Sequence, residues 1–249
     1  MTQTRIYEDI IEINKEDVLN FWTKRAELDN LNSVLLGNQK TIEENINRNE
    51  KEKKLLELFL KNSSINLENC SILDIGCGMG RWANNFANKI EAYTGIDFTE
   101  SFIIKNKEKF KEFKNINFHT MPIEEINLEK LSKNYDCIII TGVLMYVNDS
   151  KLDSVFEKIN LLNPKTIYLQ ESICTQNSRL SLNKFYSQEL NCDYSAIYRT
   201  KNEYEEYFEN HLKTYKIANN GLLIKQNKET SPMYWFFKKQ EILWLERKL

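Results

Sequence analysis

The sequence contains little glycine, proline or histidine, and these shortages narrow what the chain can be. Among its 249 residues there are 7 glycines, 3 prolines and 2 histidines. With so few histidines, we predict no metal site. Apolar runs are also short, because none approaches the ~20 residues that span a membrane. The N-terminus is acidic and mixed, unlike a secretory signal peptide. We therefore expect no membrane partner.

Neither sign of charge is in excess, and the cysteines show no disulfide framework. The 34 basic and 36 acidic residues leave a net charge of -2, whereas binding to a nucleic-acid backbone favours a basic excess. We predict no nucleic-acid partner. None of the five cysteines forms a C-x-x-C pair, which is typical of reduced thiols in a cytoplasmic protein.

The first 62 residues are predicted to be helical. Residues 16–31 place Val18, Phe21 and Trp22 on one helical face, and residues 48–62 form a second amphipathic helix. The polar segment between them is expected to turn at Gly37–Asn38. No repeat or low-complexity linker divides the chain. We predict a single domain over residues 1–249, with the N-terminal helices (residues 1–62) as a lid.

Strand-like and helix-like segments alternate over residues 63–173. Short apolar runs are separated by amphipathic stretches; the runs are CSILDIG, AYTGID, NINFHT, YDCIIITG and KTIYLQESI. Such alternation is typical of βαβ units and a parallel sheet covered on both faces. The remainder, residues 174–249, is predicted to hold a long polar and aromatic loop (174–200), a helix (201–212) and two strands. The predicted fold class is α/β: a Rossmann-like, doubly wound, mostly parallel sheet with an antiparallel C-terminal strand.

Three of the few glycines stand at alternate positions directly after a buried strand, in ILDIGCGMGRW. Gly76, Gly78 and Gly80 permit positive φ and let a ligand approach the backbone, and ligands of parallel sheets bind beyond the carboxyl ends of the strands. The turn is either a tight structural connection or a nucleotide site. The dinucleotide pattern G-x-G-x-x-G does not match, because its third glycine position is occupied by Arg81.

With an acid two residues before it, the turn resembles the first motif of class I S-adenosylmethionine-dependent methyltransferases, of bacterial small-molecule type. That motif reads acid-x-G-x-G-x-G, here from Asp74 to Gly80. In TGIDFTESFI the resemblance implies that Asp97 binds the ribose hydroxyls and that Phe98 lies near the adenine, and YDCIIITGVLMYVND is similar to the fourth-strand motif of the family. The implied cofactor is S-adenosylmethionine, held by Asp74, Gly76, Cys77, Gly78, Gly80, Asp97, Phe98 and Thr141.

The chain departs from the family after the third strand, in FHTMPIEEI. Pro122 stands where many members carry an acid that holds the adenine amino group. The adenine would then contact Met121 and Ile123. On the N-terminal side, Trp22 and Arg25 either close over the cofactor as part of the lid or pack on the sheet as an ordinary helix face.

The long loop after residue 173 is the predicted acceptor site, because binding residues concentrate in loops. Its candidate substrate contacts are Tyr186, Tyr194, Tyr198 and Arg199. Methyl transfer depends mainly on an aligned nucleophile, and a hydroxyl acceptor also needs a base. Glu171 and Tyr146, expected at the carboxyl ends of strands, are the candidate catalytic residues.

The predicted reaction is O-methylation of a sugar or nucleotide-linked precursor of surface-polysaccharide biosynthesis. The segment AIYRTKNEYEEYF, which resembles small-molecule methyltransferases of such pathways, suggests this acceptor class. N-methylation of a small amine or aminosugar is one alternative, and a non-catalytic protein that binds the adenosyl cofactor is another. The partner is expected to be a small-molecule acceptor, and the chain a monomer or homodimer.

Overall fold

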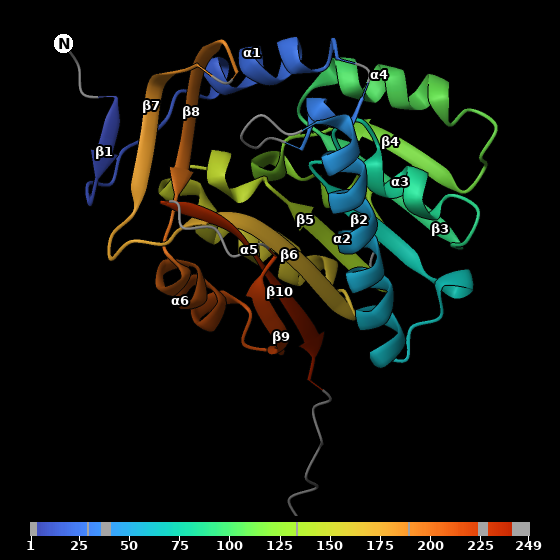
Figure 1. Cartoon of the computed structure of the whole chain (residues 1–249). Helices are drawn as coiled ribbons and strands as arrows, with labels where there is room; N and C mark the ends of the chain where they lie inside the picture. Colours follow the sequence, from blue (N-terminus) through green and yellow to red (C-terminus); the bar gives the residue numbers. More distant parts are fainter. Residues whose placement is uncertain are drawn as a thin grey trace, which may run out of the picture.

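The computed structural model describes residues 4–28, 30–35, 41–132, 134–188, 190–223 and 229–240. Its centre is a seven-stranded sheet in the order β4-β3-β2-β5-β6-β10-β9 (Figure 1). β10 pairs antiparallel with both β6 and β9, and the other strand pairs of this sheet are parallel. The strands are β2 (Ser71–Ile75), β3 (Ala92–Asp97), β4 (Ile116–Thr120), β5 (Cys137–Thr141), β6 (Thr166–Cys174), β9 (Tyr215–Leu222) and β10 (Thr230–Lys239). This arrangement confirms the predicted fold class.

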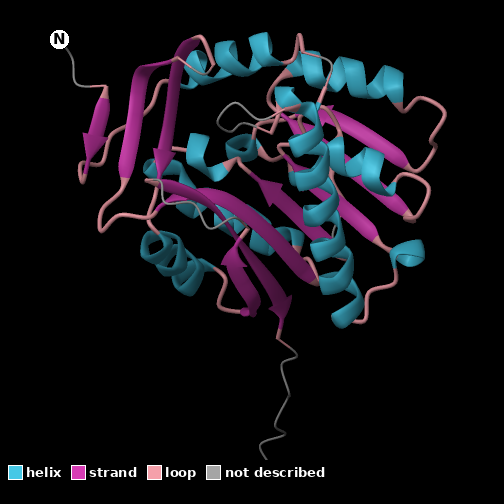
Figure 2. Ribbon diagram, in the orientation of Figure 1, coloured by secondary structure: helices cyan, strands magenta, loops and turns pink. Residues whose placement is uncertain are grey.

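Helices cover both faces of the sheet because its central strands are buried on both sides. Side chains alternate along β5, so that Ile138 and Ile140 pack toward α5 (Asp149–Leu162) and α6 (Lys201–His211). Cys137 and Ile139 pack on the other face, among the apolar side chains of α2 (Ile42–Asn62), α3 (Arg81–Phe86) and α4 (Glu100–Lys109). Figure 2 shows the two helical layers around the strands.

The second predicted helix begins earlier in the structure than the periodicity indicates. α2 starts at Ile42, within the segment predicted to be polar connection, because Thr41 and Glu44 form a capping box. The Glu44 N–H donates to the Thr41 hydroxyl at 3.2 Å, and the Thr41 N–H donates to the Glu44 carboxylate at 2.7 Å. This reciprocal cap stabilises the helix start. The turn expected at Gly37–Asn38 lies outside the described residues.

Residues 174–200 are not a loop, which corrects the sequence prediction. They form a hairpin of β7 (Leu180–Ser187) and β8 (Cys192–Tyr198), and β1 (Arg5–Tyr7) adds a third antiparallel strand to it. Apolar side chains of the hairpin pack on α1 (Lys15–Arg25), where the Phe21 and Tyr194 rings lie 5.1 Å apart and Ile197 packs on Val18. The polar residues interspersed along the two strands give the segment its loop-like composition.

The small sheet and α1 lie beyond the carboxyl ends of the central strands, at the left and top of Figure 1. A cavity that is partly open to solvent lies between them and the main sheet. Within the described residues, no helix combines the length and apolarity needed to cross a membrane.

Candidate functional site

The glycine turn has the backbone conformation that its sequence predicts. Gly76 and Gly78 have φ of +74° and +50°, in the left-handed region that favours glycine. A Cβ atom at Gly76 would come within 2.3 Å of the Val143 side chain. Both glycines line a cavity of about 330 Å³ at the carboxyl ends of the strands.

We expect a Gly76→Ala substitution to abolish measurable cofactor binding while the chain stays folded. The added methyl group would strain a positive φ and collide with Val143. Calorimetric titration with S-adenosylhomocysteine measures the loss, and circular dichroism checks the fold. Gly221→Ala in β9 is the control, because Gly221 lies outside the cavity lining and its added Cβ atom would come no nearer than 3.2 Å to the Tyr234 side chain. Equal binding by the Gly76 variant and wild type would contradict the expected close contact at this turn.

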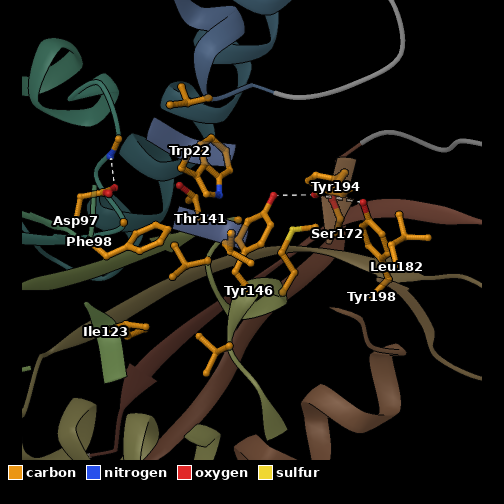
Figure 3. Close-up of a pocket in the computed structure, with 18 of the residues that line it drawn as sticks. Trp22, Asp97, Phe98, Ile123, Thr141, Tyr146, Ser172, Leu182, Tyr194 and Tyr198 are labelled. Atoms are coloured by element: carbon orange, nitrogen blue, oxygen red, sulfur yellow. Dashed lines mark hydrogen bonds between the residues drawn. The ribbon is translucent and has the colours of Figure 1, made fainter. Parts of the chain in front are cut away.

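One half of the cavity is built by the residues predicted to hold the cofactor. Gly76 and Gly78 lie at one wall, and Asp97, Phe98, Met121, Ile123 and Thr141 complete this half. Met121 and Ile123 are buried apolar side chains, suitable for packing against an adenine ring. Figure 3 shows Asp97, Phe98 and Ile123 at one end of the cavity.

Asp97 connects the end of β3 to the glycine turn. Its carboxylate accepts hydrogen bonds from the Gly78 N–H at 2.9 Å and the Thr99 N–H at 2.8 Å. Thr99 is the N-cap residue of α4, but its own side chain makes no cap hydrogen bond, and the Asp97 carboxylate accepts from its N–H. Burial raises the pKa of Asp97. A carboxylate has about four lone-pair sites, so Asp97 retains acceptor capacity for hydroxyl groups of a ligand.

The other half of the cavity has aromatic and hydroxyl walls. The Tyr146 and Tyr194 hydroxyls lie 2.7 Å apart, and the Tyr198 hydroxyl donates to that of Tyr194 at 3.4 Å. The Trp22 ring meets the Tyr146 ring edge-on at 5.5 Å. Figure 3 shows these side chains converging: Trp22 comes from α1, Tyr146 from the segment after β5, and Tyr194 and Tyr198 from β8. Ser172 and Leu182 lie beside them. We call this the acceptor half.

The comparisons with known proteins identify the family. Residues 66–236, more than half of the chain, match the methyltransferase domain family. The chain belongs to the class I S-adenosylmethionine-dependent methyltransferases. This confirms the predicted family, and with the family comes the predicted cofactor, S-adenosylmethionine.

Individual relatives of this methyltransferase are distant. Phosphoethanolamine N-methyltransferase 1 of Caenorhabditis elegans is 26% identical over 171 residues, which cover 68% of this chain and 34% of that protein. The chain thus spans about a third of the length of this relative. Among solved structures, phosphoethanolamine N-methyltransferase 1 of Haemonchus contortus, in complex with phosphoethanolamine and S-adenosylhomocysteine, has a TM-score of 0.67, 20% identity and coverage of 92% and 50%. Magnesium protoporphyrin IX methyltransferase of Synechocystis, with bound S-adenosylmethionine, has a TM-score of 0.63, 13% identity and coverage of 93% and 100%.

Three predicted cofactor residues of this methyltransferase lie behind the cavity wall. Asp74 is buried and its carboxylate accepts a 2.5 Å hydrogen bond from the Tyr93 hydroxyl. Burial raises the pKa of Asp74 to about 7. Cys77 is a buried thiol, and Gly80 begins α3 with a positive φ. All three belong to the glycine turn or its support, and none lines the cavity.

Several residues predicted to act on the substrate also lie outside the cavity lining. Glu171, the predicted base, is 1% exposed and its carboxylate accepts backbone N–H groups. Arg199 is 0% exposed and forms an ion pair with Asp149 at 2.8 Å. Tyr186 is 54% exposed and bonds Asn191. The side chains of Glu171, Arg199 and Tyr186 are held by the protein itself, which corrects the expectation that they face an acceptor. Arg25, predicted to close over the cofactor or to pack as a helix face, also lies outside the cavity lining and donates to the Ser33 carbonyl at 3.4 Å.

Sequence reasoning missed Arg48, which lines the cavity from α2. Its Nε pairs with Glu52 at 2.7 Å, and the Glu52 carboxylate also binds Arg81 at 2.7 Å and the Gln170 amide at 3.2 Å. In the sequence Arg48 and Glu52 show only an i,i+4 spacing, which is typical of a surface pair on a helix. The signal that distinguishes them is tertiary: Glu52 is 1% exposed.

The described residues contain no group of three or more histidine, cysteine, aspartate or glutamate side chains placed to hold a metal ion.

Proposed function

We propose that this chain transfers the methyl group of S-adenosylmethionine to the nitrogen of a small amine. The observation that carries the proposal is the acceptor half, where Trp22, Tyr146 and Tyr194 surround a space next to the cofactor half. N-methylation of a small amine is one of the alternatives that the sequence leaves open, and the geometry favours it over O-methylation.

The cofactor half has the features that the proposed cofactor requires. Gly76 and Gly78 expose backbone where a side chain would collide, Asp97 offers carboxylate oxygens for ribose hydroxyls, and Met121 and Ile123 offer apolar contact for adenine. When bound, S-adenosylmethionine supplies a methyl group on a positively charged sulfur, and the amine lone pair forms the N–C bond as the C–S bond electrons pass to the sulfur. The chain then contributes mainly alignment of the two reactants.

The residues that define the acceptor half, Trp22, Tyr146, Tyr194, Tyr198, Ser172 and Leu182, include no carboxylate or imidazole that could deprotonate a hydroxyl acceptor. The described carboxylates that line the cavity, Asp97 and Glu124, lie at the end of β3 and just after β4. Burial raises the pKa values of Tyr146 and Tyr194 well above their ordinary value. These phenols therefore stay protonated near neutral pH. A hydroxyl acceptor must lose a proton to a base, whereas an amine needs only to arrive neutral. The aromatic rings also attract the ammonium product, because a cation over a ring face is stabilised by about 0.5–2 kcal/mol.

Arg48 indicates which chemical group the acceptor carries at the end opposite its amine. Arg48 lines the cavity, as do the hydroxyl-bearing residues Ser172 of β6 and Thr230 of β10. A guanidinium beside hydroxyls suits a phosphate or carboxylate. We therefore propose an acceptor with an amine at one end and an anionic group at the other. The relatives named phosphoethanolamine N-methyltransferase support this class of acceptor.

An acceptor screen with matched pairs tests the proposed function. Phosphoethanolamine, ethanolamine and an aminosugar phosphate are compared with hydroxyl acceptors of similar size, such as a hexose phosphate and a nucleotide sugar, by release of S-adenosylhomocysteine. We expect turnover with amines and a lower KM when the amine carries phosphate. Turnover only with the hydroxyl acceptors would favour the O-methylation predicted from the sequence. Cofactor binding without turnover on any acceptor would favour the non-catalytic alternative.

We expect Tyr194→Phe to raise the acceptor KM about 5–10-fold and to leave cofactor affinity unchanged. The substitution removes a hydroxyl that bonds Tyr146 and Tyr198, worth roughly 1 kcal/mol. Tyr186→Phe on the same hairpin is the comparison, because the Tyr186 hydroxyl bonds Asn191 outside the cavity. Steady-state kinetics on both variants measure the difference. Equal KM values for the two would contradict an acceptor contact at Tyr194.

The lid, the quaternary state and the location in the cell stay predictions. For the lid, α1 contributes Val18 and Trp22 to the cavity wall and packs against β8, which supports residues 1–62 as its cover. We also propose one domain over residues 1–249, a monomer or homodimer, and a cytoplasmic location.

A further inference from the structure

Tyr146 reaches the acceptor half from a single short turn. After β5 the chain passes through Gly142 and forms the 3-10 turn η5 (Leu144–Tyr146). Within the turn the Tyr146 N–H donates to the Val143 carbonyl at 2.9 Å, and the Val147 N–H to the Leu144 carbonyl at 3.1 Å. A turn of this length has too few internal hydrogen bonds to hold its own shape.

A buried carboxylate binds the N–H side of this turn. Glu171 lies in β6 and accepts hydrogen bonds from three consecutive N–H groups, those of Val143 at 2.9 Å, Leu144 at 2.8 Å and Met145 at 3.3 Å. The side chain is 1% exposed and does not line the cavity. It satisfies donors that would otherwise be buried without partners, and a buried unsatisfied N–H is destabilising.

A buried guanidinium binds the carbonyl side of the same turn. Arg199, directly after β8, donates from Nη1 to the Leu144 carbonyl at 2.9 Å and from Nη2 to the Val147 carbonyl at 2.7 Å. Its Nε pairs with Asp149 at 2.8 Å, the first residue of α5. Arg199 is 0% exposed. The negatively charged carboxylate of Glu171 therefore binds the backbone N–H groups of the turn, and the positively charged guanidinium of Arg199 binds its backbone carbonyls.

We propose that Glu171 and Arg199 are positioning residues for methyl transfer, which fix the backbone turn that presents Tyr146 to the acceptor. The inference rests on the proposed function, because it gives the position of Tyr146 a role in catalysis. Neither residue touches the cavity, so each acts through the turn. The position of the turn also affects two neighbouring side chains, because the Tyr146 hydroxyl hydrogen-bonds the Tyr194 hydroxyl and the Tyr146 ring packs edge-on against Trp22.

The charge state of Glu171 sets how well it holds the turn. Burial raises the pKa of Glu171 to about 7, against the opposing effect of its three N–H bonds. The charged and titratable groups that act on it are Arg199, Tyr146 and Tyr204, of which only Arg199 is charged near neutral pH. Above pH 7 the carboxylate is ionised and accepts all three N–H groups. Below pH 7 it takes up a proton, and the turn loosens.

The test compares wild type with Glu171→Gln by two independent measurements. The first is hydrogen exchange of the Val143, Leu144 and Met145 amides at pH 8, which requires no activity. The amide side chain presents one acceptor oxygen and one donor nitrogen, so we expect these amides to exchange at least ~10-fold faster. The second is kcat, which we expect to fall ~10–100-fold, as a displaced group allows, with the cofactor Kd unchanged. Glu157→Gln, an exposed change on α5, is the control.

The pH profile separates positioning from general damage to the fold. The ratio of the wild-type kcat to that of the Glu171→Gln variant is expected to rise with pH through about 7, because only wild type gains a negative charge at that position. A flat ratio contradicts the inference, as does unchanged amide exchange in an active enzyme. Faster exchange with wild-type kcat shows that a fixed turn is not needed, and also overturns it. If wild type turns over no acceptor, the proposed function fails and the positioning role with it.

Arg199→Lys is the second variant, chosen because it keeps the charge. Lysine lacks the planar fork that reaches two carbonyls at once. We expect kcat to fall by ~10-fold and the Val147 amide to exchange faster, while cofactor Kd and melting temperature change little. A loss of kcat that follows a loss of melting temperature in both variants would reduce Glu171 and Arg199 to ordinary structural residues and overturn the proposal.

Discussion

An Asp97→Ala variant should bind S-adenosylhomocysteine ~100-fold more weakly than wild type, a loss of about 3 kcal/mol. The Asp97 carboxylate makes two kinds of contact at this position, one proposed with the cofactor and one observed with the glycine turn. It is the proposed partner of the ribose hydroxyls, and it binds the Gly78 N–H at 2.9 Å and thereby fixes the glycine turn. Removing it leaves the Gly78 and Thr99 N–H groups without their acceptor. The loss should therefore exceed that of a single ligand contact.

Titration calorimetry with S-adenosylhomocysteine measures this change, and a thermal melt shows whether the variant remains folded. Glu108→Ala on α4 serves as the control, because Glu108 is exposed and its only described ion pair is with Lys111 at 2.7 Å. A folded Asp97 variant that binds within 3-fold of wild type would show that the cavity holds its ligand without this carboxylate. The cofactor half would then need a different assignment.

Glu52→Ala is expected to lower the free energy of unfolding by about 3–5 kcal/mol. Glu52 is 1% exposed, and its carboxylate neutralises Arg81, itself 6% exposed, at 2.7 Å. It also binds Arg48 at 2.7 Å and the Gln170 amide at 3.2 Å. Without it, Arg81 becomes a buried charge without its ion-pair partner, and breaking such a pair is far more destabilising than losing a surface pair.

Urea denaturation of the Glu52 and Glu57 variants at neutral pH tests the expectation. Glu57→Ala is a matched control on the same helix, because Glu57 pairs with the half-exposed Lys89 at 3.3 Å and should contribute less than about 1 kcal/mol. Burial opposes ionisation of Glu52, but the charges of Arg81 and Arg48 hold its pKa below the ordinary 4.5. The stabilisation is therefore present above pH 4.5 and decreases as the pH falls through the lower folded-state pKa. Equal destabilisation by both variants would contradict a buried network.

The parts of the site that the sequence predicts are those encoded by neighbouring residues. Gly76 and Gly78 need no tertiary knowledge, because alternate glycines after a buried strand already indicate a left-handed turn. Asp97, at the end of the next strand, is predicted by the resemblance to the methyltransferase motif, which needs only neighbouring residues. The apolar runs of β2, β3 and β5 are long enough to predict a doubly wound sheet.

The parts that the sequence does not predict depend on which distant residues meet. Glu171 ends an apolar run, as a catalytic acid would, and only the folded chain shows that three N–H groups bind its carboxylate. Arg199 and Tyr198 are consecutive, yet one is buried in an ion pair and the other lines the cavity. The sequence does not reveal the hairpin of β7 and β8, because polar residues interrupt the apolar ones along both strands and their alternation is irregular.

The two halves of the cavity differ in how far apart in the sequence their segments lie, as the pairing of β1 with β7 shows. Arg5 pairs with Leu182 across the small sheet, so the acceptor half is closed by segments from opposite ends of the sequence. The cofactor half is formed by consecutive strand–turn units. Closing a long loop costs more chain entropy than closing a short one, although the cost grows slowly with length. Under the proposed function, acceptor recognition would be assembled from long-range contacts, and sequence changes in the hairpin would alter the acceptor without disturbing the locally encoded cofactor half.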